Sequence, residues 1–245
     1  MPGDAVLEAR GLRKVFRKTV AVAGVDITVA PGERVALLGA NGAGKTTTLL
    51  MLLGAITPDE GTIDVLGHRL PHGRSAAMNG VGFSAGYLPL PDRLRVLEVL
   101  RVFADLYGVR DAEAAARGGL ERFGISHLAD QMASELSSGQ RTLVGLVKAT
   151  MHAPRLLVLD EPTASLDPDV AARARRGLDE LWQEQKTAVL VTSHNMSEVE
   201  RICERVVFIS RGKVVANGAA DAVAAQFGRN SLEEVFMQLA SEEDL

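Results

Sequence analysis

The chain has 245 residues, of which 47% are hydrophobic and 24% are charged, so an intrinsically disordered or collagen-like chain is excluded. Its 27 basic and 31 acidic residues give a net charge of −4, which argues against a basic protein that coats nucleic acid. The single cysteine, Cys203, excludes an intrachain disulfide and a cysteine-rich zinc site.

The N-terminal part of the chain predicts strands, a loop and a helix. Residues 6–10 and 25–29 alternate apolar and polar side chains, which is the period of a half-buried strand. Residues 34–38 form a nearly continuous apolar run, typical of a strand covered on both faces. A glycine-rich loop leads from this run to helix-forming residues 46–53, and residues 61–67 predict a further strand. We therefore expect an antiparallel β layer near the start of an α/β core.

The middle of the chain predicts mainly helices. Apolar residues recur at helical spacing through about residues 97–153. Buried strands are then predicted over 156–159 and 188–192, with a helix over 170–184 between them. This alternation of strands and helices favours a sheet with parallel strands.

The C-terminal part predicts a hairpin between helices. Its expected elements are a helix over 197–204 and strands over 206–209 and 213–215. Residues 231–239 follow as an amphipathic helix, for which Ser231 is the expected N-cap and Glu234 the second member of a capping box.

Residues 39–46 form the first motif that carries chemistry. They read G-A-N-G-A-G-K-T and match the phosphate-loop pattern, between a predicted buried strand and a predicted helix. The glycines let backbone N–H groups and the positive end of the helix face phosphate oxygens. Lys45 adds a charge at the β- and γ-phosphates, and Thr46 offers a hydroxyl to Mg²⁺. The residues expected to bind nucleotide here are Gly39, Asn41, Gly42, Gly44, Lys45, Thr46 and Thr47.

Two acidic residues end the buried strand over 156–159. A strand parallel and adjacent to residues 34–38 would place Asp160 near Mg²⁺ and Glu161 toward the γ-phosphate, where it can polarise a water as general base. The alternative is a strand end with two solvated acids, and the upstream phosphate loop makes the functional interpretation the better one.

The ordered set of motifs resembles the ABC ATPases over almost the whole chain. Residues 136–140, L-S-S-G-Q, are similar to the LSGGQ signature of that family, and residues 162–167 to its D-loop. His194 follows Thr-Ser as the family's switch histidine does, and Phe16 lies where the family has an aromatic residue that stacks on adenine. The ending S-L-E-E-V-F at residues 231–236 resembles that of nucleotide-binding subunits of bacterial ABC-2 type exporters.

This resemblance implies an α/β fold of the ABC ATPase type. Its parts would be a P-loop NTPase core with a mixed and parallel sheet, an N-terminal antiparallel β subdomain and an inserted helical subdomain. We expect a single domain over 1–245, with the helical insertion at about 90–153 and the C-terminal hairpin and helices at about 205–245.

The resemblance also implies ATP hydrolysis, with Mg²⁺, in a homodimer whose subunits pair head to tail. The signature of one subunit would face the γ-phosphate held by the other. The candidate residues outside the phosphate loop are Phe16 for the base, Glu161 and His194 for catalysis, Thr46 and Asp160 for Mg²⁺, Ser137, Ser138, Gly139 and Gln140 for the signature, and Ser165 and Asp167 for the D-loop.

The implied partners are separate transmembrane permease subunits, and no nucleic acid is expected. Their cytoplasmic helices would dock in a groove from about Ser84 to Tyr107. No uncharged apolar run reaches the roughly 18–20 residues of a membrane span, and no secretory signal is visible in residues 1–10. We therefore expect a peripheral protein on the cytoplasmic face of the cell membrane. The transported substrate is not indicated, and export rests on the subfamily resemblance.

One position departs from the family pattern. Most ABC ATPases have a glutamine at a strand end between the phosphate loop and the signature, where it contacts Mg²⁺ and the attacking water. Gly86 falls at this position, and no glutamine occurs anywhere from Thr47 to Asp130. Two hypotheses follow: ATP hydrolysis that is slow or differently coupled, or ATP binding and dimerisation with little turnover. The first is preferred because Glu161 and His194 are retained.

Other functions remain open at this stage. A soluble ABC ATPase could act on ribosomes, chromosomes or cluster assembly, but ribosome-type members carry two such domains and chromosome-type members a long coiled coil. Among these soluble ATPases, a partner of a cluster-assembly scaffold remains an alternative to the transporter subunit. A simple kinase or GTPase would leave residues 136–140 unexplained.

Overall fold

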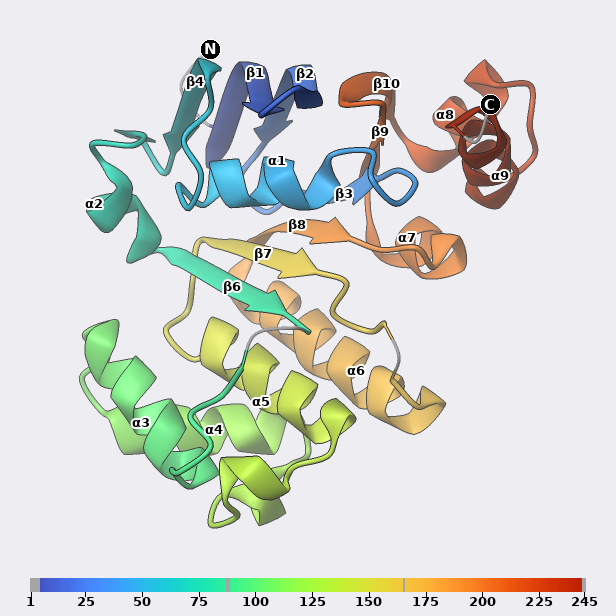
Figure 1. Cartoon of the computed structure of the whole chain (residues 1–245). Coiled ribbons are helices and arrows are strands. Elements are labelled where there is room, and N and C mark those ends of the chain that lie inside the picture. The colour runs from blue at the N-terminus through green and yellow to red at the C-terminus, as the bar shows by residue number, and fades with distance from the viewer. Residues whose placement is uncertain (1–4, 87–88, 165, 244–245) are drawn as a thin grey trace. The chain divides into compact units, whose positions relative to one another are not determined.

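The computed structural model describes residues 5–86, 89–164 and 166–243 (Figure 1). The chain forms two compact units, the first from Met1–Met78 with Ala188–Leu245 and the second from Asn79–Thr187. The predicted α/β class is confirmed, because strands of mixed direction alternate with helices along the chain. The prediction of a single domain over 1–245 stays a prediction.

An antiparallel sheet occupies the N-terminal part of the first unit. Its strands are β1 (Leu7–Phe16), β2 (Thr19–Val29), β4 (Glu60–Val65) and β5 (His68–Arg69), in the order β2-β1-β4-β5. Buried residues alternate with more exposed ones at the start of β1 and along the end of β2, as the sequence predicts. The predicted antiparallel layer is therefore confirmed, and both of its first strands are longer than expected.

The first unit also contains the strand that leads into the phosphate loop. This strand, β3 (Arg34–Leu38), pairs in parallel with β8 (Ala188–Thr192) on one side and with β9 (Arg205–Ser210) on the other. The hairpin partner of β9 is β10 (Lys213–Gly218), which is antiparallel to it. Four consecutive residues of β3, from Val35 to Leu38, are fully buried, so this strand is covered on both faces as predicted.

Helices of the first unit follow these strands. They are α1 (Lys45–Leu52), α2 (Arg74–Met78), α7 (Met196–Ile202), α8 (Ala220–Gln226) and α9 (Leu232–Glu243). The predicted capping box of α9 is only half formed. The Glu234 backbone N–H donates to Ser231 Oγ at 3.3 Å, but the Glu234 carboxylate accepts from the Asn230 N–H instead. The Glu234 carboxylate therefore caps the N–H of Asn230, one residue before the predicted N-cap Ser231.

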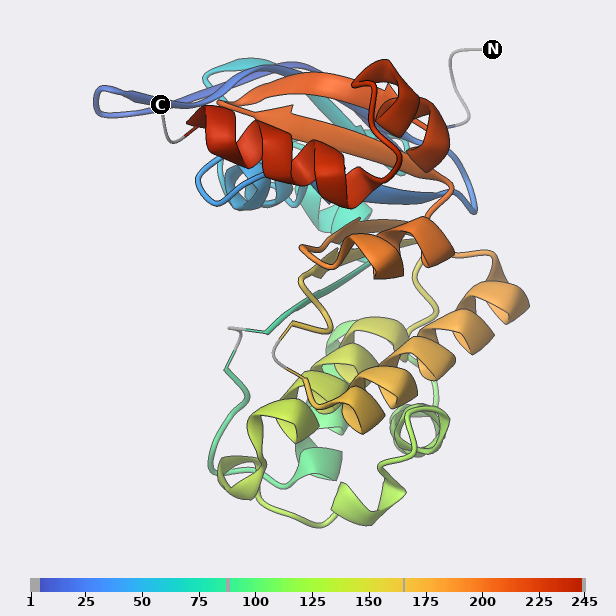
Figure 2. The ribbon, with the colours of Figure 1, turned by 90° about the vertical axis from the view of Figure 1, so that its right-hand side faces the viewer.

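The second unit is mainly helical, as predicted for the middle of the chain. A parallel pair, β6 (Val81–Ala85) and β7 (Leu156–Asp160), accompanies α3 (Val96–Leu106), α4 (Ala112–Arg122), α5 (Ser138–Thr150) and α6 (Pro168–Gln185). Figure 2 shows these helices gathered into one cluster, in which α4 packs on α3 and α5, and α5 packs on α6. The Phe123 side chain is buried there, and its ring would contact a side-chain carbon added at Gly177.

Candidate functional site

The phosphate loop lies between β3 and α1 in the first unit. Gly39, Gly42 and Gly44 have φ angles of 152°, 86° and 106°, a region that side chains disfavour. A Cβ on Gly39 would lie 2.2 Å from the Ile209 carbonyl oxygen, and one on Gly44 would lie 2.5 Å from the Ala21 carbonyl oxygen. Only glycine therefore allows the loop to fold this closely against the neighbouring strands.

The Lys45 side chain lies back along this loop. Its Nζ donates to the carbonyl oxygens of Gly39 at 2.7 Å and Ala40 at 3.0 Å. Thr46, the next residue, is exposed, whereas the Thr48 hydroxyl is buried and donates to the Gly44 carbonyl. The ammonium and the Thr46 hydroxyl thus occupy the helix start that the motif assigns to phosphate and Mg²⁺. The remaining predicted residues are the exposed Asn41 and the half-buried Thr47.

The register of two strands brings His194 to the same sheet edge as the phosphate loop. In the parallel pair of β3 and β8, Leu37 lies opposite Thr192, so the two strands end at corresponding positions on the same edge of the sheet. His194 follows two residues after Thr192 and is exposed. The following turn is fixed, because Ser193 Oγ accepts from the Asn195 N–H and Asn195 Oδ1 accepts from the N–H of Glu198 in α7.

Phe16, the predicted adenine contact, ends β1 in the same unit. Its side chain is 44% exposed, although β1 is otherwise well covered at its start. The Lys14 Nζ lies 5.6 Å from the centroid of the ring. The aromatic side chain is therefore accessible to a planar ligand.

The two predicted acids end β7 in the second unit. The Asp160 side chain is nearly enclosed, at 7% exposure, and the four residues before it are buried. Glu161 has a φ of 50°, the left-handed region that non-glycine residues rarely adopt. Such a backbone costs about 1–3 kcal/mol and is shared by other described residues, among them Arg17 and Leu66, so the role of Glu161 rests on its place after Asp160.

The signature segment begins α5. Ser137 is its N-cap and forms a complete capping box with Gln140. The Gln140 N–H donates to Ser137 Oγ at 3.3 Å, and the Ser137 N–H donates to Gln140 Oε1 at 2.9 Å. This box uses the acceptor oxygens of both side chains, so the Ser137 hydroxyl and the Gln140 amide keep their O–H and N–H donors for a ligand. A Cβ on Gly139 would lie 3.3 Å from Val170 of α6, so the turn is closely packed.

Arg141 binds the backbone that precedes the signature turn, a contact that the sequence did not predict. Its guanidinium donates to the carbonyl oxygens of Leu136 at 3.2 Å and Ser134 at 3.1 Å, and its Nη1 reaches Asp92 at 3.4 Å. An arginine directly after the motif, in the first turn of a helix, was the available signal. The bonds could not be inferred because they depend on how the preceding backbone folds.

Three further predicted positions lie in the second unit. Asp167 is exposed at the N-cap of α6 without a side-chain capping bond, and Ser165 lies outside the described residues. Gly86 follows β6 and is exposed, and a Cβ on it would meet no atom of the described residues within 4 Å beyond its chain neighbours. A larger side chain therefore fits at Gly86, so close packing does not explain the missing glutamine.

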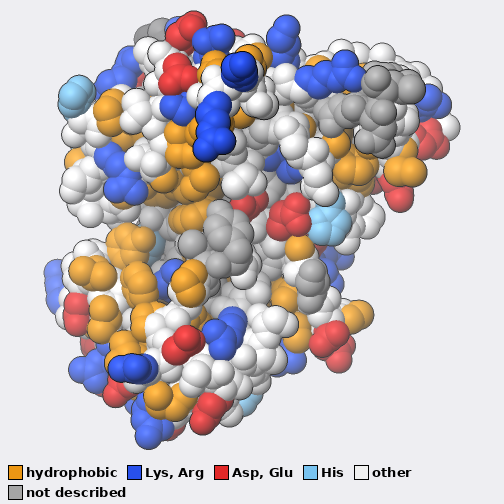
Figure 3. Space-filling view, viewed as in Figure 1, with side chains coloured by type: hydrophobic (Ala, Val, Ile, Leu, Met, Phe, Trp, Pro, Cys, Tyr) orange, Lys and Arg blue, Asp and Glu red, His pale blue; other side chains and the backbone are white. Residues whose placement is uncertain are grey.

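The surface of α3 carries exposed apolar side chains within the predicted docking segment. Val102 is 48% and Leu106 is 72% exposed, and Figure 3 shows apolar side chains at the surface in this region of the second unit. The neighbouring Tyr107 ring stacks on His152, with centroids 3.8 Å apart and planes within 6°. Burial raises the pKa of Tyr107 and lowers the pKa of His152. This stack is therefore neutral at physiological pH.

Mg²⁺ prefers oxygen ligands such as hydroxyl and carboxylate groups. Phosphates and water molecules usually provide most of its other ligands. The exposed Thr46 hydroxyl in the first unit and the Asp160 carboxylate in the second are each an oxygen donor of this kind. Within residues 5–86, 89–164 and 166–243, no three His, Cys, Asp or Glu side chains gather as a metal cage. The donor set suits an ion that arrives with a nucleotide.

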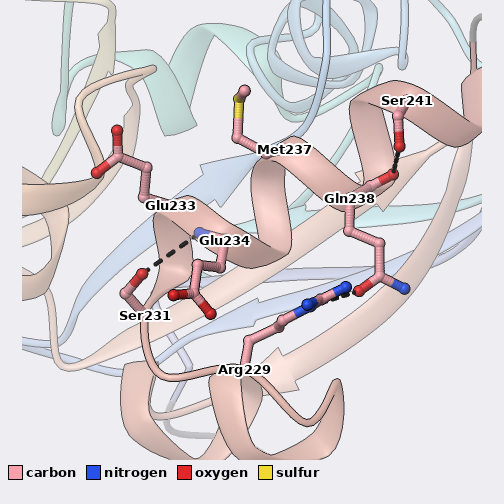
Figure 4. A pocket seen from close by; sticks show the side chains of 7 residues that line it. All are labelled: Arg229, Ser231, Glu233, Glu234, Met237, Gln238 and Ser241. Atoms are coloured by element: carbon pink, nitrogen blue, oxygen red, sulfur yellow. Dashed lines mark hydrogen bonds between the residues drawn. The ribbon is translucent and has the colours of Figure 1, made fainter.

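A shallow pocket of about 540 Å³ lies elsewhere on the first unit, along α9 (Figure 4). Its lining is Arg229, Ser231, Glu233, Glu234, Met237, Gln238 and Ser241. The Arg229 guanidinium donates to Gln238 Oε1 at 3.0 Å, so its one basic group is already engaged. None of the predicted site residues lines this pocket.

Comparisons with known proteins agree on one family. The ABC transporter family model matches residues 22–164. A Nod factor export ATP-binding protein I of Cupriavidus metallidurans is 38% identical over 216 residues, which cover 87% of this chain and 71% of that protein. The probable multidrug ABC transporter ATP-binding protein YbhF of Escherichia coli is 35% identical over 257 residues, which cover 99% of this chain and 43% of that protein.

A solved structure matches the whole fold. An ATP-binding subunit of an ABC transporter superposes with a TM-score of 0.86 at 29% identity, covering 96% of this chain and 99% of that one. In the part of this chain that the structure describes, no helix has the length and hydrophobicity needed to cross a membrane.

Proposed function

This chain belongs to the ABC transporter family as an ATP-binding ATPase subunit, and we propose that it works as a head-to-tail homodimer that powers export through separate membrane subunits. The observation that supports ATP hydrolysis at this site is the β3–β8 register, which leaves the phosphate loop and His194 at one sheet edge. Export is supported by the two relatives, whose names describe Nod factor export and multidrug transport.

Nucleotide binding begins at the phosphate loop. The backbone N–H groups around Gly42 and Gly44 and the start of α1 offer donors to the β- and γ-phosphates. On binding, the Lys45 ammonium exchanges its two loop carbonyls for phosphate oxygens. Each charge-assisted hydrogen bond contributes about 1.5–3 kcal/mol, so a few of them sustain useful affinity.

Mg²⁺ would be held by the Thr46 hydroxyl and the Asp160 carboxylate, together with the phosphates. Its charge offsets the negative charge that builds on the phosphoryl oxygens during transfer. The chain would supply these two oxygens, and Asp160 is held at the end of a buried strand.

Glu161 is the proposed general base and His194 the proposed γ-phosphate contact. Glu161 directly follows the buried strand β7, and its carboxylate would accept the proton that the attacking water loses. The imidazole of His194 donates a hydrogen bond to the γ-phosphate and fixes it for in-line attack.

The signature of the second subunit completes the site. The α5 N-terminus, with Ser137, Ser138, Gly139 and Gln140, would direct donors at the γ-phosphate bound by the first subunit. ADP lacks this phosphate, so hydrolysis removes the contacts that favour the dimer. The D-loop residues Ser165 and Asp167 would lie at the same interface.

The membrane subunits would dock on the segment from Ser84 to Tyr107. The exposed Val102 and Leu106 on α3 offer an apolar surface of the kind that an amphipathic helix covers. The chain would then be peripheral at the cytoplasmic face of the membrane.

Single-turnover phosphate release by the purified chain with Mg²⁺ and ATP tests the proposal. Loss of a general base slows a reaction by about 10²–10⁴-fold, so we expect Glu161→Gln to slow release by this factor while ATP still binds. Glu180→Gln, on the exposed face of α6, is the matched control and should release phosphate as the unmodified chain does. Equal rates for Glu161→Gln and the unmodified chain would refute the catalytic assignment.

A further inference from the structure

The end of β1 is tied to the turn before β4 through one carboxylate. Arg13 lies opposite Glu60 in the antiparallel pair of β1 and β4, which sets Asp59 beside Lys14. Asp59 Oδ1 accepts from Lys14 Nζ at 2.8 Å, and Asp59 Oδ2 accepts from the Val15 backbone N–H at 2.8 Å. The Asp59 N–H in turn donates to the Arg13 carbonyl at 2.9 Å. Both carboxylate oxygens therefore bind the strand just before Phe16.

The Lys14 side chain completes this connection. Its Nζ also donates to the Thr57 carbonyl at 2.8 Å, and the side chain is only 16% exposed. The same ammonium lies 5.6 Å from the Phe16 ring centroid, within the range of a cation–π contact. Asp59 thus fixes the backbone next to Phe16 and also the cation that lies over the ring.

Phe16 needs such support because of its place in the hairpin. It is the last residue of β1, it pairs with Thr19 at the end of the ladder, and Arg17 beyond it has a φ of 55°. Ends of exposed hairpins open more readily than their centres. The Lys14 hydrogen bond and the Val15 N–H hold the pKa of the Asp59 carboxyl below its usual value, so the carboxylate stays charged at physiological pH.

We infer that Asp59 is a positioning residue for the nucleobase, which holds the Phe16 ring in place through Val15 and Lys14 so that a purine can stack on it. This inference rests on the base-stacking role of Phe16 in the proposed function. A cation over an aromatic ring draws electron density from it, which favours stacking with an electron-rich purine. Asp59 lies outside the phosphate loop, so its effect should be confined to the base.

Two probes separate base binding from phosphate binding: ATP, and inorganic tripolyphosphate, which has no base. With Mg²⁺ present, we expect Phe16→Ala to raise the Kd for ATP about tenfold, the loss of one base–aromatic stack. Asp59→Ala should raise it about threefold to fivefold, because the ring remains but is no longer held. Neither variant should change the Kd for tripolyphosphate. Titration calorimetry measures all of these values.

Three further variants sharpen the test. Asp59→Asn keeps one acceptor oxygen for Val15 but not the charge that holds Lys14, so its effect should be smaller than that of Asp59→Ala. The double variant, Phe16→Ala with Asp59→Ala, should bind ATP no more weakly than Phe16→Ala alone, because both act through one ring. Asp64→Ala is the matched control, since this carboxylate pairs with Arg69 on the same sheet and should change neither Kd.

The outcomes distinguish the inference from the proposed function. Suppose that Phe16→Ala changed only the Kd for ATP, while Asp59→Ala changed the Kd for both probes or for neither. Asp59 would then have no positioning role, and the role of Phe16 would stand. Additive losses in the double variant would also overturn the inference. If Phe16→Ala did not discriminate between the probes, the stacking role itself would fail. If the unmodified chain did not bind ATP, the proposed function would fail.

Discussion

The phosphate loop of the first unit and the signature turn of the second are fixed by different kinds of interaction. Backbone packing fixes the loop, because Gly39 and Gly44 lie too close to neighbouring carbonyl oxygens for any side chain. Side-chain hydrogen bonds fix the turn, through the capping box of Ser137 and Gln140 and the guanidinium of Arg141. A steric constraint fails abruptly when it is violated, whereas a set of hydrogen bonds weakens one bond at a time. Changes in the loop should therefore be severe, and changes in the turn graded.

The largest effect is expected from Gly44→Ala. The added carbon would lie 2.5 Å from the Ala21 carbonyl oxygen at a φ of 106°, so the loop has to move. We expect a loss of about 2–4 kcal/mol in the free energy of unfolding and a fall in ATP affinity of about a hundredfold or more. Denaturant unfolding and ATP titration measure the two. Gly86→Ala is the control, because the added carbon meets no atom within 4 Å in the part of the chain that the structure describes. Equal losses in both variants would contradict a steric origin.

Arg141→Ala should have the next largest effect, confined to the turn. It removes two bonds to the carbonyl oxygens of Leu136 and Ser134, together with the ion pair to Asp92, which is exposed and worth little by itself. Hydrogen bonds from charged groups contribute about 1.5–3 kcal/mol, so dimerisation with Mg²⁺ and a non-hydrolysable ATP analogue should weaken at least about tenfold.

ATP binding by the Arg141→Ala monomer should be unchanged, because the phosphate loop belongs to the other unit. Sedimentation measures dimerisation and calorimetry measures ATP binding. Arg117→Ala is the matched control, since this exposed arginine pairs with Glu113 within α4. A loss of ATP affinity in the Arg141→Ala monomer would mean that the turn and the loop are not independent.

The sequence was enough to predict the phosphate loop, but not the hydrogen bonds that support the signature turn. A constraint that only glycine satisfies leaves glycine in the sequence, so residues 39–46 are recognisable without a structure. The bonds of Arg141 and Asp59 leave no such trace, because an arginine or aspartate is compatible with many contacts. Asp59 meets Lys14 across 45 residues only because β1 pairs with β4.

The fold shows the same division between local and distant information. The strand over 34–38 was predicted with its observed bounds, since a run of buried apolar residues is a local pattern. Its register against β8, which brings His194 to the phosphate loop's edge, is a long-range property that no local pattern encodes. Helix α8 (Ala220–Gln226) was missed although it is rich in alanine, because it is short and Ala219 at its N-cap gives no capping signal.

A smaller effect is expected from Ser137→Ala. It removes the acceptor for the Gln140 N–H and should cost about 1 kcal/mol in the free energy of unfolding, as loss of an N-cap usually does. Asp111→Ala is a matched control, because Asp111 caps α4 by accepting from the Ala114 N–H. Both variants should lose similar stability, but only Ser137→Ala should weaken dimerisation with the ATP analogue. If both weakened it equally, the signature serine would act only as a cap.

The smallest effect is expected from Gly86→Gln, which restores the side chain that most ABC ATPases carry. The position is exposed and open, so the glutamine should be accommodated without loss of stability. Because the phosphate loop is unaffected, the Kd for ATP should stay within about twofold, while the amide can orient the attacking water and change the single-turnover rate by about threefold or more. Gly118→Gln, at another open and exposed glycine on α4, controls for the added side chain. A change in ATP affinity larger than the change in rate would show that Gly86 matters for binding, and that the second unit contributes to holding the nucleotide before hydrolysis begins.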